Sequence, residues 1–153
     1  MSRKPLVVAV SGGFDPVHVG HIELFREAKK LGDRLVVILN NDHWLKKKKG
    51  YVFMPELQRK AVLEAIRHVD EVILTSHPEN PDDMSVCAEL EKIRPEIFAN
   101  GGDRNEMDAA NPKSSLYKDI GTCRELGIKM VFNVGGKKAQ SSSELVKKIR
   151  DVS

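Results

Sequence analysis

The sequence predicts an α/β fold: a Rossmann-like, doubly wound sheet of five parallel strands with helices on both faces. Five short segments are apolar without alternation, which is typical of strands buried on both faces in a parallel sheet. A segment with helical spacing of apolar residues follows each of them. This repeated order implies a parallel sheet with right-handed crossovers. The chain has 153 residues and no linker-like stretch, so we expect a single domain, residues 1–153.

The first half of the chain is expected to form three strands and two helices. The strands are expected at residues 6–10, 34–40 and 69–74, and the helices at 20–31 and 55–68. In the first helix, Phe25 and Ala28 fall on one apolar stripe, and Gly32 follows as a stop signal. Pro55 suits the first position of the second helix. Residues 46–50, four lysines and a glycine, are expected to form a loop.

The second half is expected to add two strands and three helices. The strands are expected at residues 96–99 and 128–134, and the helices at 84–93, 113–126 and 142–152. Gly127 ends the fourth helix, and the glycine pair at 135–136 ends the fifth strand. Residues 105–112 are polar and have no period, so we expect a loop over the site or a mobile lid.

The composition is that of an ordinary globular protein and disfavours several classes of function. It is 41% hydrophobic and 31% charged. A net charge of +3 with 5% aromatic residues does not favour nucleic acid as a partner. No apolar run approaches the ~18 residues of a membrane span, and no signal-peptide core follows the start, so we expect a cytoplasmic protein. Cys87 and Cys123 are isolated, which fits reduced thiols.

The unusual loops all follow strands. They lie at residues 12–21, 40–42, 101–103 and 135–143. Because the carboxyl ends of parallel strands meet at one edge of the sheet, these loops are expected to converge. Ligands of such sheets bind at that edge, where the strand order reverses.

The stretch at residues 12–21 is the strongest candidate for a phosphate site. Gly12 and Gly13 permit a tight turn and close backbone approach by a ligand. His18 and His21 then stand at the start of a helix, where unpaired N–H groups attract phosphate. The histidines alone are also compatible with zinc ligation or with a surface or capping role. The flanking strand, glycines and helix favour phosphate.

The stretch Gly-Gly-Phe-Asp-Pro-Val-His-Val-Gly-His resembles the HxGH signature of the nucleotidyltransferase superfamily. Residues 28–42, 56–72, 101–103 and 141–143 resemble segments of its glycerol-3-phosphate cytidylyltransferase and heptose-phosphate adenylyltransferase branches. Class I aminoacyl-tRNA synthetases share the histidine motif, but they need a far longer chain.

The resemblance implies attack by a phosphate monoester on the α-phosphorus of a nucleoside triphosphate, with release of pyrophosphate. His18, His21, Lys48 and Arg67 are then the expected catalytic residues, with the histidines donating hydrogen bonds to the triphosphate. The expected nucleotide-binding residues are Gly12, Gly13, Phe14, Asp15, Gly20, Lys46, Gly101, Asp103, Ser141, Ser142 and Ser143. Asn41, Asp42 and Arg104 are expected to bind the acceptor substrate.

Several of these residues also have a structural explanation. Lys48 matches a family lysine best, but any lysine of the run at 46–49 could enter the site, and the run could be a solvated charged surface. Arg59 and Arg67 both match family arginines, and for Arg59 a helix-surface ion pair is the favoured reading. Ser141 and Glu144 have capping-box spacing, which is compatible with phosphate binding at the same helix start.

The chain departs from the glycerol-phosphate branch in two places. Gly136 stands where that branch has an arginine, and Lys137 and Lys138 are its only nearby charges. Residues 105–117 are longer than the corresponding segment, which makes them either a specificity element or a surface insertion.

The sequence therefore predicts a nucleotidyltransferase that transfers NMP from an NTP to a small phosphorylated alcohol or sugar. CTP is slightly favoured over ATP, and a heptose-phosphate-type adenylyltransferase is the alternative. A non-catalytic nucleotide-binding module is the rival of another class. Mg²⁺ is expected to arrive with the nucleotide rather than in a protein site, so no metal-ligating residues are assigned. Neither a nucleic acid nor a membrane is expected as a partner, and a homodimer is compatible with the resemblance.

Overall fold

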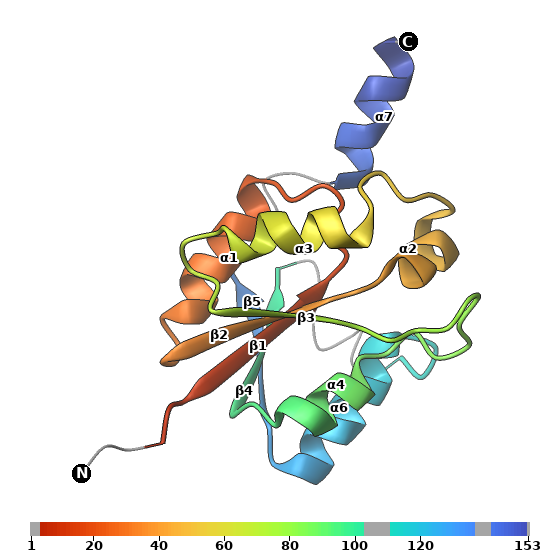
Figure 1. Ribbon diagram of the computed structural model, residues 1–153. Coiled ribbons are helices and arrows are strands. Elements are labelled where there is room, and N and C mark those ends of the chain that lie inside the picture. The colour runs from red at the N-terminus through yellow and green to blue at the C-terminus, as the bar shows by residue number, and fades with distance from the viewer. Residues whose placement is uncertain (1–3, 103–110, 137–141, 153) are drawn as a thin grey trace.

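The computed structural model describes residues 4–102, 111–136 and 142–152. Within these residues, five strands form one parallel sheet in the order β3-β2-β1-β4-β5 (Figure 1). The strands are β1 (Val7–Gly12), β2 (Arg34–Leu39), β3 (Glu71–Leu74), β4 (Ile97–Gly101) and β5 (Lys129–Val134). The predicted Rossmann-like fold class is confirmed. The strand order reverses between β1 and β4, which opens a crevice beyond their carboxyl ends.

The central strand explains the unbroken apolar run near the N-terminus. β1 pairs with β2 along its whole length and with β4 on its other edge. Val8, Ala9 and Val10 are fully buried. The absence of alternation in the sequence is thus a direct consequence of helices covering both faces.

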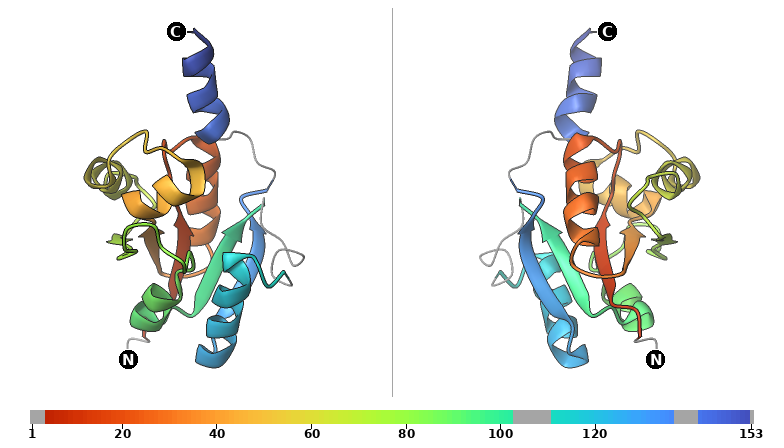
Figure 2. Two further views of the ribbon diagram at one scale, coloured as in Figure 1. Left: turned by 90° about the vertical axis from the view of Figure 1, so that its right-hand side faces the viewer. Right: turned by 90° about the vertical axis from the view of Figure 1, so that its left-hand side faces the viewer.

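Helices cover both faces of the sheet (Figure 2). On one face, α1 (Val19–Lys29) and α3 (Glu56–Glu64) pack Phe25, Ala28 and Leu63 into a core with β1 and β2. On the other, α4 (Cys87–Ile93) and α6 (Ser115–Leu126) pack Leu90 and Cys123 against Ala9 and Phe98. Both cores form from the apolar stripes that the sequence displays.

The lysine run is helical, contrary to the loop expected there. Residues 42–49 form α2 (Asp42–Lys49), in which Asn41 caps the start by accepting the N–H of Trp44. Gly50 ends the helix with a φ of 83°, a left-handed conformation that suits glycine. The cap and the stop signal stand nine residues apart in the sequence, so this helix was detectable.

Two other helices are shorter than expected by three residues or more. α3 ends at Glu64, before the expected end at residue 68. α4 begins at Cys87 instead of residue 84, because Met84 and Ser85 use their carbonyls as acceptors for the side chains of Trp44 and His77. A tertiary contact therefore overrides local helix propensity there.

The last helix, α7 (Ser142–Val152), projects away from the sheet (Figures 1 and 2). Val146 is buried, whereas Ile149 is 56% exposed. Arg150 lies over the ring of Tyr51, 4.8 Å from its centroid, and joins the helix to the α2–α3 connection. Among the helices that the structure describes, none combines the length and apolar character needed to cross a bilayer.

Candidate active site

A cavity of about 340 Å³ lies at the carboxyl ends of β1 and β4, where the strand order reverses. Seven of the chain's eleven glycines line it, so much of its wall is bare backbone. Its volume falls within the range of small-ligand sites. The lining residues are Ser11, Gly12, Gly13, Phe14, His18, Gly20, His21, Leu24, Trp44, Lys48, Lys49, Ala99, Asn100, Gly101, Gly102, Val134, Gly135, Gly136, Ser142 and Ser143.

The two motif histidines are fixed by a reciprocal capping box at the start of α1. His18 Nδ1 accepts the N–H of Gly20 at 3.1 Å, and His21 Nδ1 accepts the N–H of His18 at 3.1 Å. Their rings stack with centroids 3.8 Å apart. Because each Nδ1 accepts a backbone hydrogen, the ring proton of the neutral imidazole lies on Nε2. The cap thus turns both histidines into Nε2–H donors, and both line the cavity.

Phe14 packs against this pair of histidines. Its ring meets the ring of His21 edge-on at 4.8 Å and that of Phe25 at 5.3 Å. Its backbone has a φ of 48°, which is uncommon outside glycine. A Cβ on Gly12 would lie 2.9 Å from the Phe14 ring, and one on Gly13 would lie 2.7 Å from Leu45. These glycines are therefore required by side-chain packing around the turn.

A second helix start borders the cavity beside the first. Ser142 and Ser143 open α7 and line the wall, and the hydroxyl of Ser142 donates to the carbonyl of Pro16 at 2.7 Å. Gly135, with a φ of 88°, allows the chain to pass the backbone of Leu24, since a Cβ there would lie 3.0 Å from its nitrogen. Two helix N-termini with their N–H groups thus meet at one cavity, an arrangement that favours anions.

The described part of the lining contains no acidic side chain. The ionisable side chains among the described lining residues are His18, His21, Lys48 and Lys49. Across the described ranges, no three His, Cys, Asp or Glu side chains gather in a way that could hold a metal ion. The geometry therefore suits a polyphosphate whose charge is met by imidazole, ammonium and backbone N–H groups.

Comparison with known proteins decides the family. The model of the "Cytidylyltransferase-like" family matches residues 9–148, nearly the whole chain. The chain belongs to the cytidylyltransferase-like family. It is a nucleotidyltransferase, and its histidine pair is the HxGH motif of that family.

Individual relatives agree with this membership. The chain is 35% identical over 151 residues to the FAD synthase of Pyrococcus abyssi, covering 98% of this chain and 96% of the relative. It is 37% identical over 99 residues to the bifunctional protein HldE of Koribacter versatilis, covering 63% of this chain and 19% of the relative. Among solved structures, a lipopolysaccharide core biosynthesis protein from Thermoplasma volcanium matches with a TM-score of 0.66 and 28% identity, covering 90% of this chain and all of the other.

Most residues expected from the cytidylyltransferase-like resemblance do reach the cavity. Lys48 lines it from α2, together with Lys49, which the sequence analysis left open as an alternative, and Trp44, which it did not assign. Lys46 is exposed on the same helix and is not among the lining residues. Helical periodicity is the reason, because a helix cannot turn residues 46 and 48 to the same side.

The three expected polar residues of the first two loops bond to the protein itself, two to backbone groups and one to a side chain. Asp15 is 1% exposed and accepts the N–H groups of Phe53 and Met54, both at 2.6 Å. Asn41 caps α2, and Asp42 pairs with Arg59 at 2.6 Å. None of these carboxylates and amides is among the described lining residues.

Arg59 is the main residue that the sequence analysis misjudged. A surface ion pair was favoured, yet its side chain is fully buried. It donates to the carbonyls of Met54, Gly13 and Asn40 and to the carboxylate of Asp42. One guanidinium therefore joins the loops after β1 and β2 to the starts of α2 and α3. The match to a family arginine pointed to Arg59. The acceptors of its five N–H donors could be identified only from the structure.

Arg67, in contrast to Arg59, is exposed. It lies in the turn before β3, at the amino end of that strand, and does not line the cavity. The structure therefore does not bring this expected catalytic residue to the site. Asp103, Arg104, Ser141 and residues 105–110 of the insertion at residues 105–117 lie outside the described residues.

Proposed function

We propose that the protein transfers AMP from ATP to a phosphorylated acceptor, with FMN as the first candidate, and releases pyrophosphate. The product of that reaction would be FAD. Support for this acceptor comes from the Pyrococcus abyssi FAD synthase, which matches nearly the full length of both chains. The slight preference for CTP in the sequence analysis is replaced by ATP for the same reason.

The observation that carries the proposal is the cavity at the strand-order switch, whose described ionisable side chains are histidines and lysines. An oxygen of the acceptor phosphate forms a bond to the α-phosphorus of ATP. The bond from that phosphorus to the oxygen bridging the β-phosphate breaks, and its electron pair leaves with pyrophosphate. The incoming phosphate is already a nucleophile, so catalysis consists of positioning and charge stabilisation.

The residues of this chain have distinct roles in that reaction. The Nε2–H groups of His18 and His21 donate to phosphate oxygens as negative charge moves to the leaving group. Lys48 and Lys49 meet phosphate as movable point charges. The N–H groups at the starts of α1 and α7 hold further oxygens.

Mg²⁺ fits the site as part of the nucleotide. The described lining offers amide and hydroxyl oxygens from Asn100, Ser142 and Ser143 but no carboxylate. An ion held by the ATP phosphates would neutralise part of their charge, and Asn100, Ser142 and Ser143 would be the residues available to hold it there.

The test is a panel of four NTPs crossed with FMN, glycerol 3-phosphate and heptose 1-phosphate, with pyrophosphate release measured. We expect ATP with FMN to give the highest kcat/KM. His18→Ala and His21→Ala should each lower kcat by about 10²–10³-fold, because each removes one donor to the developing charge. His43→Ala is the matched control, because His43 is exposed on α2 outside the cavity. Equal activity of wild type and both motif variants would refute the mechanism.

Heptose 1-phosphate is the second candidate acceptor. The resemblance of the sequence to the heptose-phosphate adenylyltransferase branch favours it, and a lipopolysaccharide core biosynthesis protein is among the similar solved structures. Pyrophosphate release with heptose 1-phosphate, compared with release with FMN in the same panel, decides between the two acceptors, since both reactions would use the same ATP site.

A further inference from the structure

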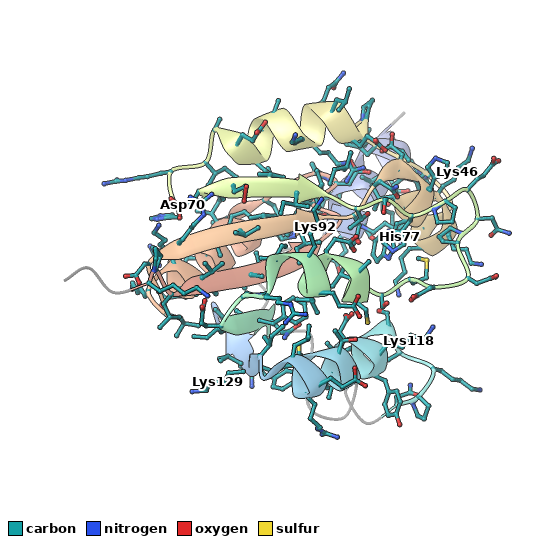
Figure 3. The ribbon with its side chains drawn as sticks, turned by 60° about the horizontal axis from the view of Figure 1, so that its bottom comes forward. Lys46, Asp70, His77, Lys92, Lys118 and Lys129 are labelled. Carbon is teal, nitrogen blue, oxygen red and sulfur yellow. The ribbon has the colours of Figure 1, made fainter. Side chains whose placement is uncertain are left out.

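The segment between β3 and α4, residues 75–86, contributes nothing to the described lining of the cavity. It is nevertheless tied to α2, the helix that carries Lys48 and Lys49. Figure 3 shows His77 in this segment, between α2 and α4. We propose that His77 is a positioning residue for nucleotidyl transfer: through Thr75 and Asn41 it fixes α2, and so the lysines that meet phosphate. This inference rests on the proposed function.

The connection is a continuous chain of hydrogen bonds. The N–H of Asn41 donates to Thr75 Oγ1 at 3.0 Å, and that hydroxyl lies 2.8 Å from His77 Nδ1. His77 Nε2 lies 3.0 Å from the carbonyl of Ser85. Asn41, Thr75 and Ser85 are 3–5% exposed, so water does not replace these bonds easily.

The hydrogen-bond partners of His77 and Thr75 determine which atom donates and which accepts in each bond. A carbonyl only accepts, so the proton of His77 lies on Nε2 and points at Ser85. Nδ1 of the neutral ring is then an acceptor, and the hydroxyl of Thr75 donates to it while accepting from Asn41. Each donor and each acceptor in this series of hydrogen bonds has one partner. Removal of the imidazole therefore leaves the buried hydroxyl of Thr75 without its acceptor and the buried carbonyl of Ser85 without its donor.

Two further bonds fasten α2 to the same segment. The side-chain amide of Asn41 donates to the carbonyl of His77 at 2.9 Å, and the indole N–H of Trp44 donates to the carbonyl of Met84 at 3.0 Å. The segment is itself anchored, because Asp119 on α6 accepts the N–H of Val86. The first turn of α2 is therefore held against α6 through residues 75–86.

This anchoring matters because α2 is short. It has eight residues, and its own hydrogen bonds cannot hold it in one place. The lysines stand in its last turn, so a shift at Asn41 moves both ammonium groups relative to the histidines. The chain of bonds would thus act on catalysis through Lys48 and Lys49 without touching substrate.

The test compares His77→Leu with His77→Gln, since a glutamine amide accepts and donates as the neutral ring does. Thr75→Val and Thr75→Ser form a second matched pair, and His68→Leu removes another half-buried histidine as a control. We expect His77→Leu and Thr75→Val to lower kcat/KM for pyrophosphate release about tenfold, the scale of one buried hydrogen bond. The glutamine, serine and His68 variants should stay near wild type.

Two readouts separate positioning from simple destabilisation. In a Lys48→Ala, Lys49→Ala background, Thr75→Val should cost little further activity, because the groups that it misplaces are gone. Trp44 is the chain's one tryptophan, so its emission reports on α2 directly, and His77→Leu and Thr75→Val should shift it to longer wavelength. An unchanged emission maximum, or the same loss of activity with and without the lysines, overturns the inference.

Failure of the proposed function gives a different result. If wild type releases no pyrophosphate with any pair in the panel, nucleotidyl transfer to those acceptors fails, while the Trp44 emission still reports whether His77 holds α2. If wild type is active and all His77 and Thr75 variants match it, the positioning role alone is wrong.

Discussion

The two edges of the sheet use charged residues in opposite ways. At the carboxyl ends of the strands (the carboxyl edge), Arg59 and Asp15 are buried and form hydrogen bonds with the backbone of the loops. At the amino edge, the pairs Lys29–Asp70, Arg34–Glu71 and Lys4–Glu96 lie half-exposed or exposed. Figure 3 shows the contrast in position, with Asp70 at one end of the strands and Lys46 and His77 at the other.

This difference indicates where the fold needs rigidity. The carboxyl-edge loops form the cavity, and glycine-rich backbone alone would not keep one shape. Buried charges that bond to several carbonyl and N–H groups fix those loops at defined positions. The amino-edge turns form no cavity, so exposed pairs of small energetic value suffice there.

The largest effect is expected from Arg59, in comparison with Arg67. Arg59→Met should lower the free energy of unfolding by about 3 kcal/mol or more, because it orphans buried carbonyls and the carboxylate of Asp42. Arg67→Met should change it by no more than about 0.5 kcal/mol, because the side chain is exposed. Urea unfolding at neutral pH measures both. Similar values for the two variants would remove the contrast between the edges.

Asp15 should show the next largest effect. Asp15→Asn keeps the size of the side chain but turns an N–H donor toward one of the two backbone donors, Phe53 or Met54. We expect a loss of about 1.5–3 kcal/mol in unfolding free energy, the scale of a charge-assisted hydrogen bond. The same unfolding experiment applies, with Asp82→Asn in an exposed loop as the control. A loss no greater than that of Asp82→Asn would show that Asp15 does not hold the loop.

The pH dependence of stability tests the role of Asp70 at the amino ends of the strands. Burial raises the pKa of Asp70, but hydrogen bonds from Lys29 and from the N–H of Leu35 outweigh it, so the net pKa lies below its usual value. A lowered carboxyl pKa contributes stability above the unfolded value of about 3.9, and this contribution is lost as pH falls through the folded value. Asp70→Asn should therefore be less stable than wild type at neutral pH, and the gap should close in acid. A gap that persists at low pH would exclude this origin.

The smallest effect is expected for Arg34 and Glu71. Their closest charged atoms are 3.4 Å apart and both side chains are 46% exposed. A double-mutant cycle with Arg34→Ala and Glu71→Ala should give a coupling of about 0–1 kcal/mol that declines with added salt. A larger, salt-insensitive coupling would mean that the amino edge is also held by its charges.

Local patterns were sufficient for most of the architecture. Continuous apolar strands, amphipathic helices and glycine stops predicted the sheet and its order of elements, because each of these signals depends on neighbours in the chain. The shape of the loops was harder to predict. The lysine run that was expected to be a loop forms α2, whose cap and stop signals were present in the sequence. α4 begins three residues later than expected, because the carbonyls of Met84 and Ser85 accept hydrogen bonds from Trp44 and His77.

By itself, the sequence determined the fold class, the histidine motif and the edge of the sheet where the site lies. Only the tertiary structure decided which polar residues line the cavity and which hold it in place. Asp15, Asn41 and Asp42 looked like ligand-binding residues and Arg59 like a surface residue. A side chain's acceptors lie on distant segments, and hydrogen bonds over that separation leave no periodic pattern in the chain. The tautomer that presents both Nε2–H groups likewise depends on the capping geometry at the start of α1.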